Sequence, residues 1–293
     1  MKWLVVSVLV AVVGSLAHAG DAKPAGLPNP FYAMDTAFTG RGLSNEQGLA
    51  LVAKLGYAGI GWHEEAPAQA RANAEAMAKA GLKMTAIYCS AKVSPEGELT
   101  VSPALKDLMA ALKGHGTIIW LHIGGKGPAF NTLAGDGQPA KTLRELADVA
   151  AANGLRIAIY PHVGEWTAKF ADATKLALVV KHPQFGVTFN LCHAMAMGEE
   201  KAIPTLLEQA KGVLFIVSIC GADTGVAGGN WGKLIQTLDQ GTFDQVALLK
   251  KLKAIGFAGP IGFQGYAIKG KPEDILGPTM QAWLKFSAAA AQD

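Results

Sequence analysis

Two stretches decide the fold: Gly186-Val-Thr-Phe-Asn190-Leu-Cys-His193 and Gly259-Pro-Ile-Gly-Phe-Gln264. Each begins as a short apolar run of the length of a buried strand, and each ends in polar side chains. Buried strands with polar carboxyl ends are typical of parallel sheets whose strand ends surround a binding site. We therefore expect the polar residues at the ends of both stretches to lie on the same edge of the sheet and to contribute to one binding site.

The same kind of run recurs along the chain, alternating with helical patterns. The eight expected strands are 31–35, 59–62, 83–89, 117–123, 156–160, 185–190, 213–219 and 260–264. Helical stretches between them include 45–55, 68–80, 141–153, 167–181, 203–211 and 243–255. Several of them end at a glycine, as at Gly56, Gly81, Gly154 and Gly256, which is the usual helix stop signal.

Eight strand-then-helix units of this size predict a (β/α)8 TIM barrel in a single domain. The alternative is a doubly wound open sheet. That fold commonly carries a glycine-rich phosphate loop after its first strand, where this chain has Asp35-Thr-Ala-Phe38.

The N-terminus has the features of a secretory signal peptide. Lys2 precedes an apolar run from Trp3 to Val13, and Ala17-His-Ala19 suits cleavage by signal peptidase. We expect a signal peptide over 1–19, a short lead over 20–30 and the barrel over 31–293, in a periplasmic or secreted protein. A retained membrane anchor is the alternative, but the run is short for a membrane span, so we expect no stable membrane insertion.

Charge and cysteine content narrow the function classes. The formal net charge of +3 comes from scattered basic residues without interleaved aromatics, which disfavours nucleic-acid binding. There is no Gly-x-Ser-x-Gly elbow of a serine hydrolase. The three cysteines, Cys89, Cys192 and Cys220, are interpreted as small buried residues, and pairing of Cys192 with Cys220 is left open.

Polar residues concentrate at the expected carboxyl ends of the strands, where a TIM barrel carries its active site. The candidate catalytic residues are His162, His193, His122 and Glu64. The candidate substrate-binding residues are Asp35, Trp62, Tyr160, Asn190, Asp223 and Gln264.

Each candidate has a structural alternative. His162 follows Pro161, which ends its strand, and is either an acid–base group or a hydrogen-bonded loop histidine. His122 lies within an apolar run and is equally explained as a core histidine. Asn190 and His193 are three residues apart and either share a cavity or satisfy backbone groups of a turn.

The remaining candidates are also open to two interpretations. Glu64 precedes a helix, where acidic residues are common. Asp35 ends a strand, where Asp often starts a turn. Asp223 lies in a glycine-rich loop that permits close backbone approach but lacks P-loop spacing.

From residue 31 to 286 the chain resembles the xylose-isomerase-like TIM-barrel superfamily. The resemblance is carried by Leu155–His162, by Phe185–His193 and by Leu238-Asp-Gln-Gly-Thr-Phe-Asp244 with Gly259-Pro-Ile261. The superfamily includes isomerases and epimerases of sugars and sugar phosphates and a branch of DNA-repair endonucleases. The resemblance therefore implies a TIM barrel with one of these activities, and the absence of a basic groove disfavours the endonuclease. In the family a divalent cation is commonly held by Glu, Asp, His and Glu at the ends of strands five to eight.

At those positions this chain has Tyr160, Asn190, Ser218 and Gln264, so the usual carboxylate ligands are replaced. Whether the protein binds a metal ion is therefore left open. One alternative is a rebuilt site of His122, His162 and His193 with Glu64 or Asp223.

The leading hypothesis is an exported carbohydrate-active enzyme of the isomerase or epimerase class, working by proton transfer on a small-molecule sugar or polyol. Its site would comprise His162, His193, Asn190 and Gln264. The alternatives are a lyase acting on a keto-sugar and a non-catalytic sugar-binding barrel that has lost its metal site. The sequence leaves the oligomeric state open.

Overall fold

A computed structural model describes residues 26–128 and 137–292. The expected signal peptide, 1–19, and the first part of the lead, 20–25, lie outside the described residues. Within them, no helix is both long enough and apolar enough to cross a membrane.

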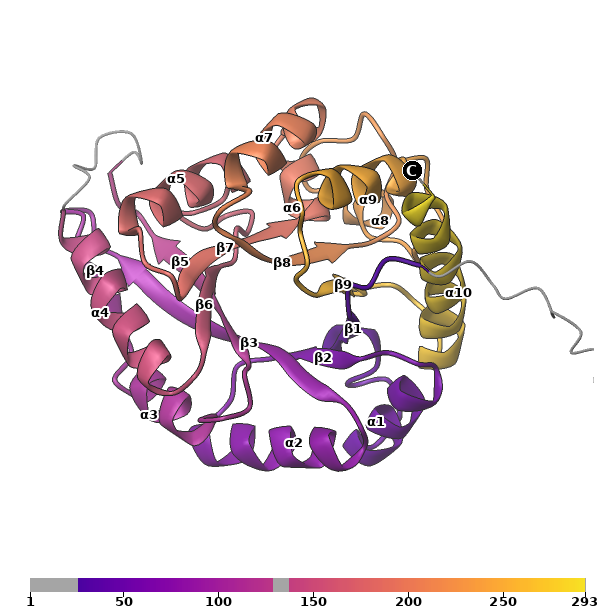
Figure 1. Ribbon diagram of the computed structural model, residues 1–293, viewed down its shortest axis with the longest axis horizontal. Coiled ribbons are helices and arrows are strands. Elements are labelled where there is room, and N and C mark those ends of the chain that lie inside the picture. The colour runs from indigo at the N-terminus through magenta and orange to yellow at the C-terminus, as the bar shows by residue number, and fades with distance from the viewer. Residues whose placement is uncertain (1–25, 129–136, 293) are drawn as a thin grey trace, which may run out of the picture.

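The predicted TIM barrel is confirmed. Eight parallel strands follow one another in the closed order β2-β1-β9-β8-β7-β6-β5-β3, with β3 returning to β2, and helices surround them (Figure 1). The barrel strands are β1 Phe31–Met34, β2 Gly59–Trp62, β3 Lys83–Val93, β5 Ile118–Gly125, β6 Arg156–Ile159, β7 Phe185–Asn190, β8 Leu214–Ile219 and β9 Ile261–Phe263. These match the eight expected strands to within a few residues.

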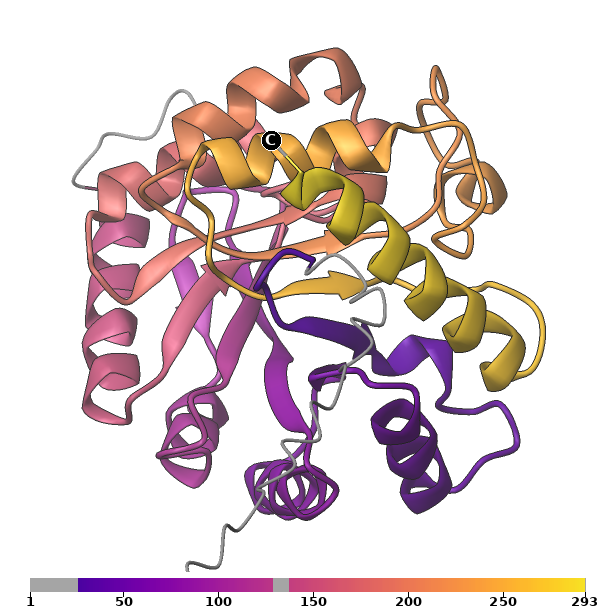
Figure 2. The same ribbon diagram turned by 45° about the vertical axis from the view of Figure 1, so that its right-hand side comes forward.

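The helices cover the outside of the barrel. They are α1 Asn45–Lys54, α2 Pro67–Lys79, α3 Ala104–Ala111, α4 Gln138–Ala152, α5 Phe170–Val180, α6 Leu191–Ala196, α7 Ile203–Ala210, α8 Trp231–Leu234, α9 Gln245–Ala254 and α10 Pro272–Ala291, with the 3-10 helices η1 Asp35–Ala37 and η3 Glu200–Ala202. The long helix α10 lies between α9 and α1 and completes the ring, as Figures 1 and 2 both show.

Besides helices α3, α8 and α10, for which no helical stretch had been singled out, the structure differs from the sequence-based expectation in two places. Strand β3 continues to Val93 and pairs antiparallel with the short strand β4, Leu99–Val101. The turn between them is held by Ser94, whose side-chain oxygen accepts from the backbone N–H groups of Glu96 and Glu98. The second difference is that Asn190 leads directly into helix α6, where we expected a loop.

The inside of the barrel is a packed core. Large side chains such as Tyr32, Trp120 and Tyr160 fill it, and glycines on other strands of the barrel make room for them. A Cβ at Gly262 would lie 2.1 Å from the Tyr32 ring, and one at Gly61 would lie 2.7 Å from Trp120. Because the interior is filled, a ligand can enter only at the two ends of the barrel.

All three cysteines are buried free thiols, in agreement with their interpretation as small core residues. Sγ of Cys192 donates to Oδ1 of Asn190, and Sγ of Cys220 donates to the carbonyl of Leu234.

Candidate active site at the carboxyl ends of the strands

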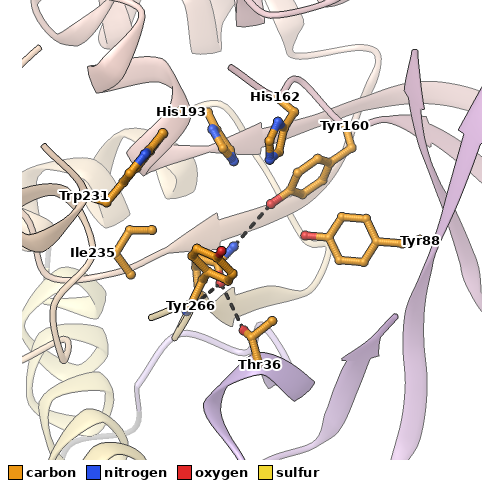
Figure 3. A pocket seen from close by; sticks show the side chains of 9 residues that line it. Thr36, Tyr88, Tyr160, His162, His193, Trp231, Ile235 and Tyr266 are labelled. Carbon is orange, nitrogen blue, oxygen red and sulfur yellow. Dashed lines mark hydrogen bonds between the residues drawn. The ribbon is translucent and has the colours of Figure 1, made fainter. Parts of the chain in front are cut away.

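A cavity of about 340 Å³ opens at the carboxyl ends of the barrel strands (Figure 3). It is lined by Thr36, Tyr88, Tyr160, His162, His193, Trp231, Ile235, Gln264 and Tyr266. Four of the ten predicted site residues are among them: Tyr160, His162, His193 and Gln264.

The floor of the cavity is a network of neutral hydrogen bonds around the Tyr160 hydroxyl. Asn190 donates to its oxygen through Nδ2, and Gln264 donates through Nε2 at 3.4 Å. Two donors occupy both lone pairs of that oxygen. The Tyr88 hydroxyl is a further hydrogen-bond partner of Tyr160, so the O–H of Tyr160 is shared between Tyr88 and any acceptor in the cavity. Burial raises the pKa of Tyr160 well above its ordinary value, which keeps this hydroxyl protonated.

The orientation of each amide follows from the partners of its oxygen. Asn190 is the N-terminal cap of helix α6, because its Oδ1 accepts from the backbone N–H of His193. The same oxygen also accepts from the Cys192 thiol. Oε1 of Gln264 accepts from the Thr36 hydroxyl at 3.2 Å and from the Tyr266 N–H at 3.0 Å. Asn190 thus combines the two interpretations offered for it, since it caps a helix and also supports the site from behind the lining.

The two histidines of the lining form a close pair. The ring centroids of His162 and His193 lie 4.2 Å apart, and both rings reach the cavity from the strand ends of β6 and β7 (Figure 3). Trp231 packs edge-on against His193 at a centroid distance of 5.4 Å.

Their hydrogen bonds assign opposite tautomers to the two neutral rings. The backbone N–H of Val163 donates to Nδ1 of His193 at 3.4 Å, so the proton of His193 is on Nε2. The carbonyl of Val163 can only accept, so His162, at 2.9 Å from it, carries its proton on Nδ1 and has a free lone pair on Nε2. One ring is therefore equipped as a base and the other as a hydrogen-bond donor.

Burial keeps both rings uncharged near neutral pH. It lowers the pKa of His193 to about 3, with a further contribution from the neighbouring His162. The pKa of His162 is also lowered, first by burial, while the carbonyl of Val163 and the carboxylate of Glu165 partly oppose the shift.

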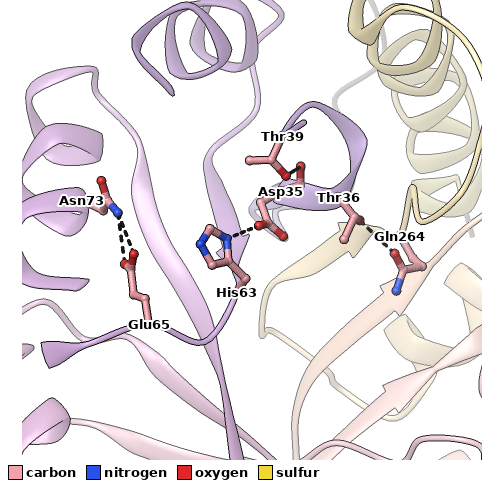
Figure 4. Close-up of polar contacts among 7 residues, drawn as sticks. All are labelled: Asp35, Thr36, Thr39, His63, Glu65, Asn73 and Gln264. Carbon is pink, nitrogen blue, oxygen red and sulfur yellow. Dashed lines mark hydrogen bonds and ion pairs between the residues drawn. The ribbon is translucent and has the colours of Figure 1, made fainter. Parts of the chain in front are cut away.

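A second polar pair lies at the ends of β1 and β2 (Figure 4). Nδ1 of His63 lies 2.5 Å from Oδ2 of Asp35. The carboxylate is 3% exposed and the imidazole 52%. The second carboxylate oxygen, Oδ1, is buried and has no hydrogen-bond partner among the residues that the structure describes. Asp35 thus lies beside the cavity residue Thr36 and positions His63, which sequence reasoning had not singled out.

The other candidates do not line the cavity. Glu64 accepts a hydrogen bond from Ser90. Trp62 is buried beneath the His63 ring, at a centroid distance of 4.7 Å. Nδ1 of His122 lies 3.6 Å from the Glu165 carboxylate. Asp223 belongs to the loop after β8, where its N–H donates to Lys233.

Five lining residues were absent from the predicted set: Thr36, Tyr88, Trp231, Ile235 and Tyr266. Tyr88 and Tyr266 follow the strand-end rule and were recognisable by it. Trp231 and Ile235 come from the long segment after β8, and nothing in their local pattern shows that this segment folds back over the mouth.

The residues at the family's metal positions do not fit a hard divalent cation. Asn190 and Gln264 are neutral amides whose oxygens already accept hydrogen bonds, and such cations prefer carboxylates. Among residues 26–128 and 137–292 there is also no group of three or more His, Cys, Asp or Glu placed to hold a metal. The rebuilt site considered from the sequence is therefore not assembled in this structure.

Comparison with known proteins gives a consistent fold. The family model described as xylose isomerase-like TIM barrel matches residues 49–285. No match was found among curated proteins. Against a fusion of a xylose isomerase-like TIM barrel with 4-hydroxyphenylpyruvate dioxygenase, the chain spans 42% of that protein's length, with 88% of this chain covered, 18% identity and a TM-score of 0.62.

Other matches span nearly the full length of the similar protein, and they include proteins named as epimerases. The IOLI protein with a binding zinc atom has a TM-score of 0.67 at 17% identity, over 88% of this chain and 98% of that one. L-ribulose 3-epimerase has a TM-score of 0.64 at 15% identity, over 89% of this chain and 95% of that one. A 3-keto-D-glucoside 4-epimerase from E. coli has a TM-score of 0.60 at 16% identity, over 88% of this chain and 99% of that one. At these identities the likeness establishes the fold.

Proposed function

The chain belongs to the xylose isomerase-like TIM barrel family, and we propose that it is an enzyme that converts a carbohydrate or polyol by proton transfer, as an isomerase or epimerase. The observation that carries this proposal is the pair of opposed tautomers, His162 and His193, on one wall of the cavity. Sugar binding alone does not need a base and a donor held side by side.

The chemistry follows from the two free Nε2 positions. The lone pair of His162 takes a proton from a carbon next to a carbonyl group. The negative charge that develops on the carbonyl oxygen is stabilised by the Nε2–H of His193, and the O–H of Tyr160 supplies a second donor. A neutral imidazole is suited to the donor role because no charged group has to be desolvated. An isomer forms when His162 returns the proton to the former carbonyl carbon and the hydroxyl proton of the adjacent carbon passes to the former carbonyl oxygen. An epimer forms when a water molecule protonates the original carbon on the opposite face and His162 releases its proton to solvent.

The rest of the lining suits a sugar. A cavity of about 340 Å³ has the size of small-molecule sites. Trp231 and Tyr266 offer aromatic faces at its mouth, and Gln264 and Thr36 offer polar groups. The epimerases among the similar structures, such as L-ribulose 3-epimerase and 3-keto-D-glucoside 4-epimerase, are named for sugar substrates, which supports the same substrate class here.

A lyase acting on a keto-sugar is the second candidate, because the same base and donor suffice for elimination. There the proton goes to His162, the electron pair forms a carbon–carbon double bond, and the group on the next carbon leaves with the electrons of its bond.

We also propose that the mature protein works outside the cytoplasm, on the strength of the basic residue and apolar run at its N-terminus. Cell fractionation and N-terminal sequencing of the mature chain test this, with a new N-terminus near Gly20 as the expected result.

The catalytic proposal is tested by proton exchange. The full chain is incubated in D2O with a panel of aldoses, ketoses and keto-glycosides, and NMR follows deuterium entering next to the carbonyl carbon. An isomerase or epimerase gives a labelled isomer, and a lyase gives an unsaturated product.

The variants His162→Gln and His193→Gln should each reduce turnover by about 10²–10⁴-fold, the usual contribution of a positioned acid or base. His115→Gln, a histidine between α3 and β5 at the other end of the barrel, is the matched control and should leave turnover unchanged. Sugar binding without any exchange would identify a non-catalytic binding barrel and refute the proposal.

A further inference from the structure

A second cavity, of about 480 Å³, lies at the opposite end of the barrel, where the strands begin. Most of its lining residues start a strand or immediately precede one, and two of them are basic: Lys83 at the start of β3 and Arg156 at the start of β6. This cavity shares no lining residue with the candidate active site.

The Arg156 side chain belongs to the inner face of the barrel. Along β6 it alternates with Ala158 and Tyr160, which are both part of the interior cluster, and alternate residues of a strand share a face. Its guanidinium lies 5.2 Å from the centroid of the Phe215 ring. Stacking of this kind holds the planar group while leaving its edge free to donate.

Lys83 brings a second positive charge to the same cavity. Burial lowers the pKa of Lys83, and repulsion from Arg156 lowers it further. The two cations are therefore close enough to destabilise each other, an arrangement that an anion between them would relieve.

Protein groups do not balance these charges. Across residues 26–128 and 137–292, neither side chain has an ion pair with a carboxylate or a hydrogen bond from its cationic group to a protein acceptor. The described segments that precede the barrel strands, 26–30, 55–58, 80–82, 112–117, 153–155, 181–184, 211–213 and 255–260, contain no Asp or Glu.

Favourable interaction with a helix dipole does not explain why Lys83 and Arg156 occur at these positions. Lysines in the last turn of a helix, such as Lys54 and Lys79, are favoured by the carbonyl groups there. Lys83 and Arg156 instead begin strands and line a cavity.

We propose that this cavity is a binding site for a small soluble anion that presents a phosphate or carboxylate group. The guanidinium of Arg156 would donate two parallel hydrogen bonds to one such group, and the ammonium of Lys83 would supply a point charge. Gln184 and Thr85 add neutral polar groups to the lining. The volume lies in the range of small-molecule sites.

Calorimetric titration of the full chain with inorganic phosphate, and separately with citrate, at low ionic strength tests the proposal. We expect saturable binding of at least one of the two anions, weakened by added salt. Lys83→Gln and Arg156→Gln should each weaken it about tenfold or more, since each removes a charged hydrogen-bond donor. Arg156→Lys should give an intermediate loss because it keeps the charge and removes the fork.

Lys92→Gln is the matched control, because Lys92 lies on the same strand, β3, near its other end, and should change binding less than twofold. Circular dichroism confirms that each variant is folded; if Arg156→Gln is not, Lys83→Gln and Arg156→Lys carry the test. The proposal is wrong if neither anion binds saturably, or if Lys83→Gln and Lys92→Gln bind alike. Binding of phosphatidylglycerol vesicles without saturable binding of phosphate or citrate would likewise overturn it, whatever the effect of Lys83→Gln.

Discussion

His162 and His193 are held in opposite tautomers by the two peptide groups of one residue, Val163. Its N–H donates to Nδ1 of His193, and its carbonyl accepts from Nδ1 of His162. The ring centroids lie 4.2 Å apart. A base and a donor are thus created from two identical side chains by backbone groups of Val163, of which the N–H would be lost only on substitution by proline.

The first prediction concerns the pH dependence of activity. Because the pKa of His162 is lowered from its ordinary value near 6.5, its Nε2 is available as a base at neutral pH. We expect kcat/KM to be constant through neutrality and to fall only as the pH drops through a value below about 6.5. A pH–rate profile with the substrate found in the exchange screen measures this, and a midpoint above that value would contradict it.

The second prediction concerns stability in acid. His193 has a folded pKa of about 3, below the value near 6.5 of the unfolded chain. Its contribution to stability is complete above the unfolded pKa and is lost as the pH falls towards the folded pKa, by up to about 1.4 kcal/mol per pH unit. Urea unfolding at several pH values should show this loss, and His193→Gln should reduce the slope between pH 6 and pH 4, a window set by the unfolded pKa.

The third prediction is for Tyr160→Phe. It removes the oxygen to which Asn190 and Gln264 donate and leaves two amides without an acceptor. We expect a loss of about 1–3 kcal/mol in unfolding free energy for each stranded donor, together with reduced turnover.

The matched control is Tyr57→Phe, which removes a single hydrogen bond, to the carbonyl of Leu276, away from the cavity. It should cost less stability and leave turnover unchanged. Equal effects of the two variants on turnover would contradict the role given to the Tyr160 network.

The fourth prediction concerns Asp35 and His63. The hydrogen bond that His63 donates to the Asp35 carboxylate raises the pKa of His63, so its contribution to stability is present below the unfolded pKa and is lost as the pH rises through the folded pKa. NMR titration should give a midpoint for His63 above about 6.5, and Asp35→Asn should lower that midpoint. An unchanged midpoint would show that the contact does not persist in solution.

The fifth prediction tests the packing of the barrel interior. At Gly262 a Cβ would lie 2.1 Å from the Tyr32 ring, so Gly262→Ala should destabilise the protein by about 1–3 kcal/mol through overpacking. At Gly212 nothing lies within 4 Å of a Cβ, so Gly212→Ala should be neutral or stabilising by up to about 1 kcal/mol. Thermal unfolding of the two variants measures the contrast.

Much of the site's location was predictable and much of its composition was not. Tyr160, His162, His193 and Gln264 line the cavity because each follows or ends a buried strand, which the run of apolar residues reveals. Trp62 and Glu64 satisfy the same rule but face elsewhere, one beneath His63 and the other towards Ser90. The position of a residue along its strand predicts that it lies at the rim of the barrel. Whether its side chain points into the cavity depends on neighbours from other strands.

The sequence by itself determined the architecture of this protein and the end of the barrel at which polar groups gather, because hydrophobic periodicity and glycine stop signals are local properties of the chain. Only the tertiary structure decided which of those groups meet. Closure of the sheet places Val163 between two histidines, sets Thr36 against Gln264, and brings Lys83 and Arg156 into one cavity. These contacts join residues far apart in the chain, and their geometry is set by strand register and packing, which no local pattern records.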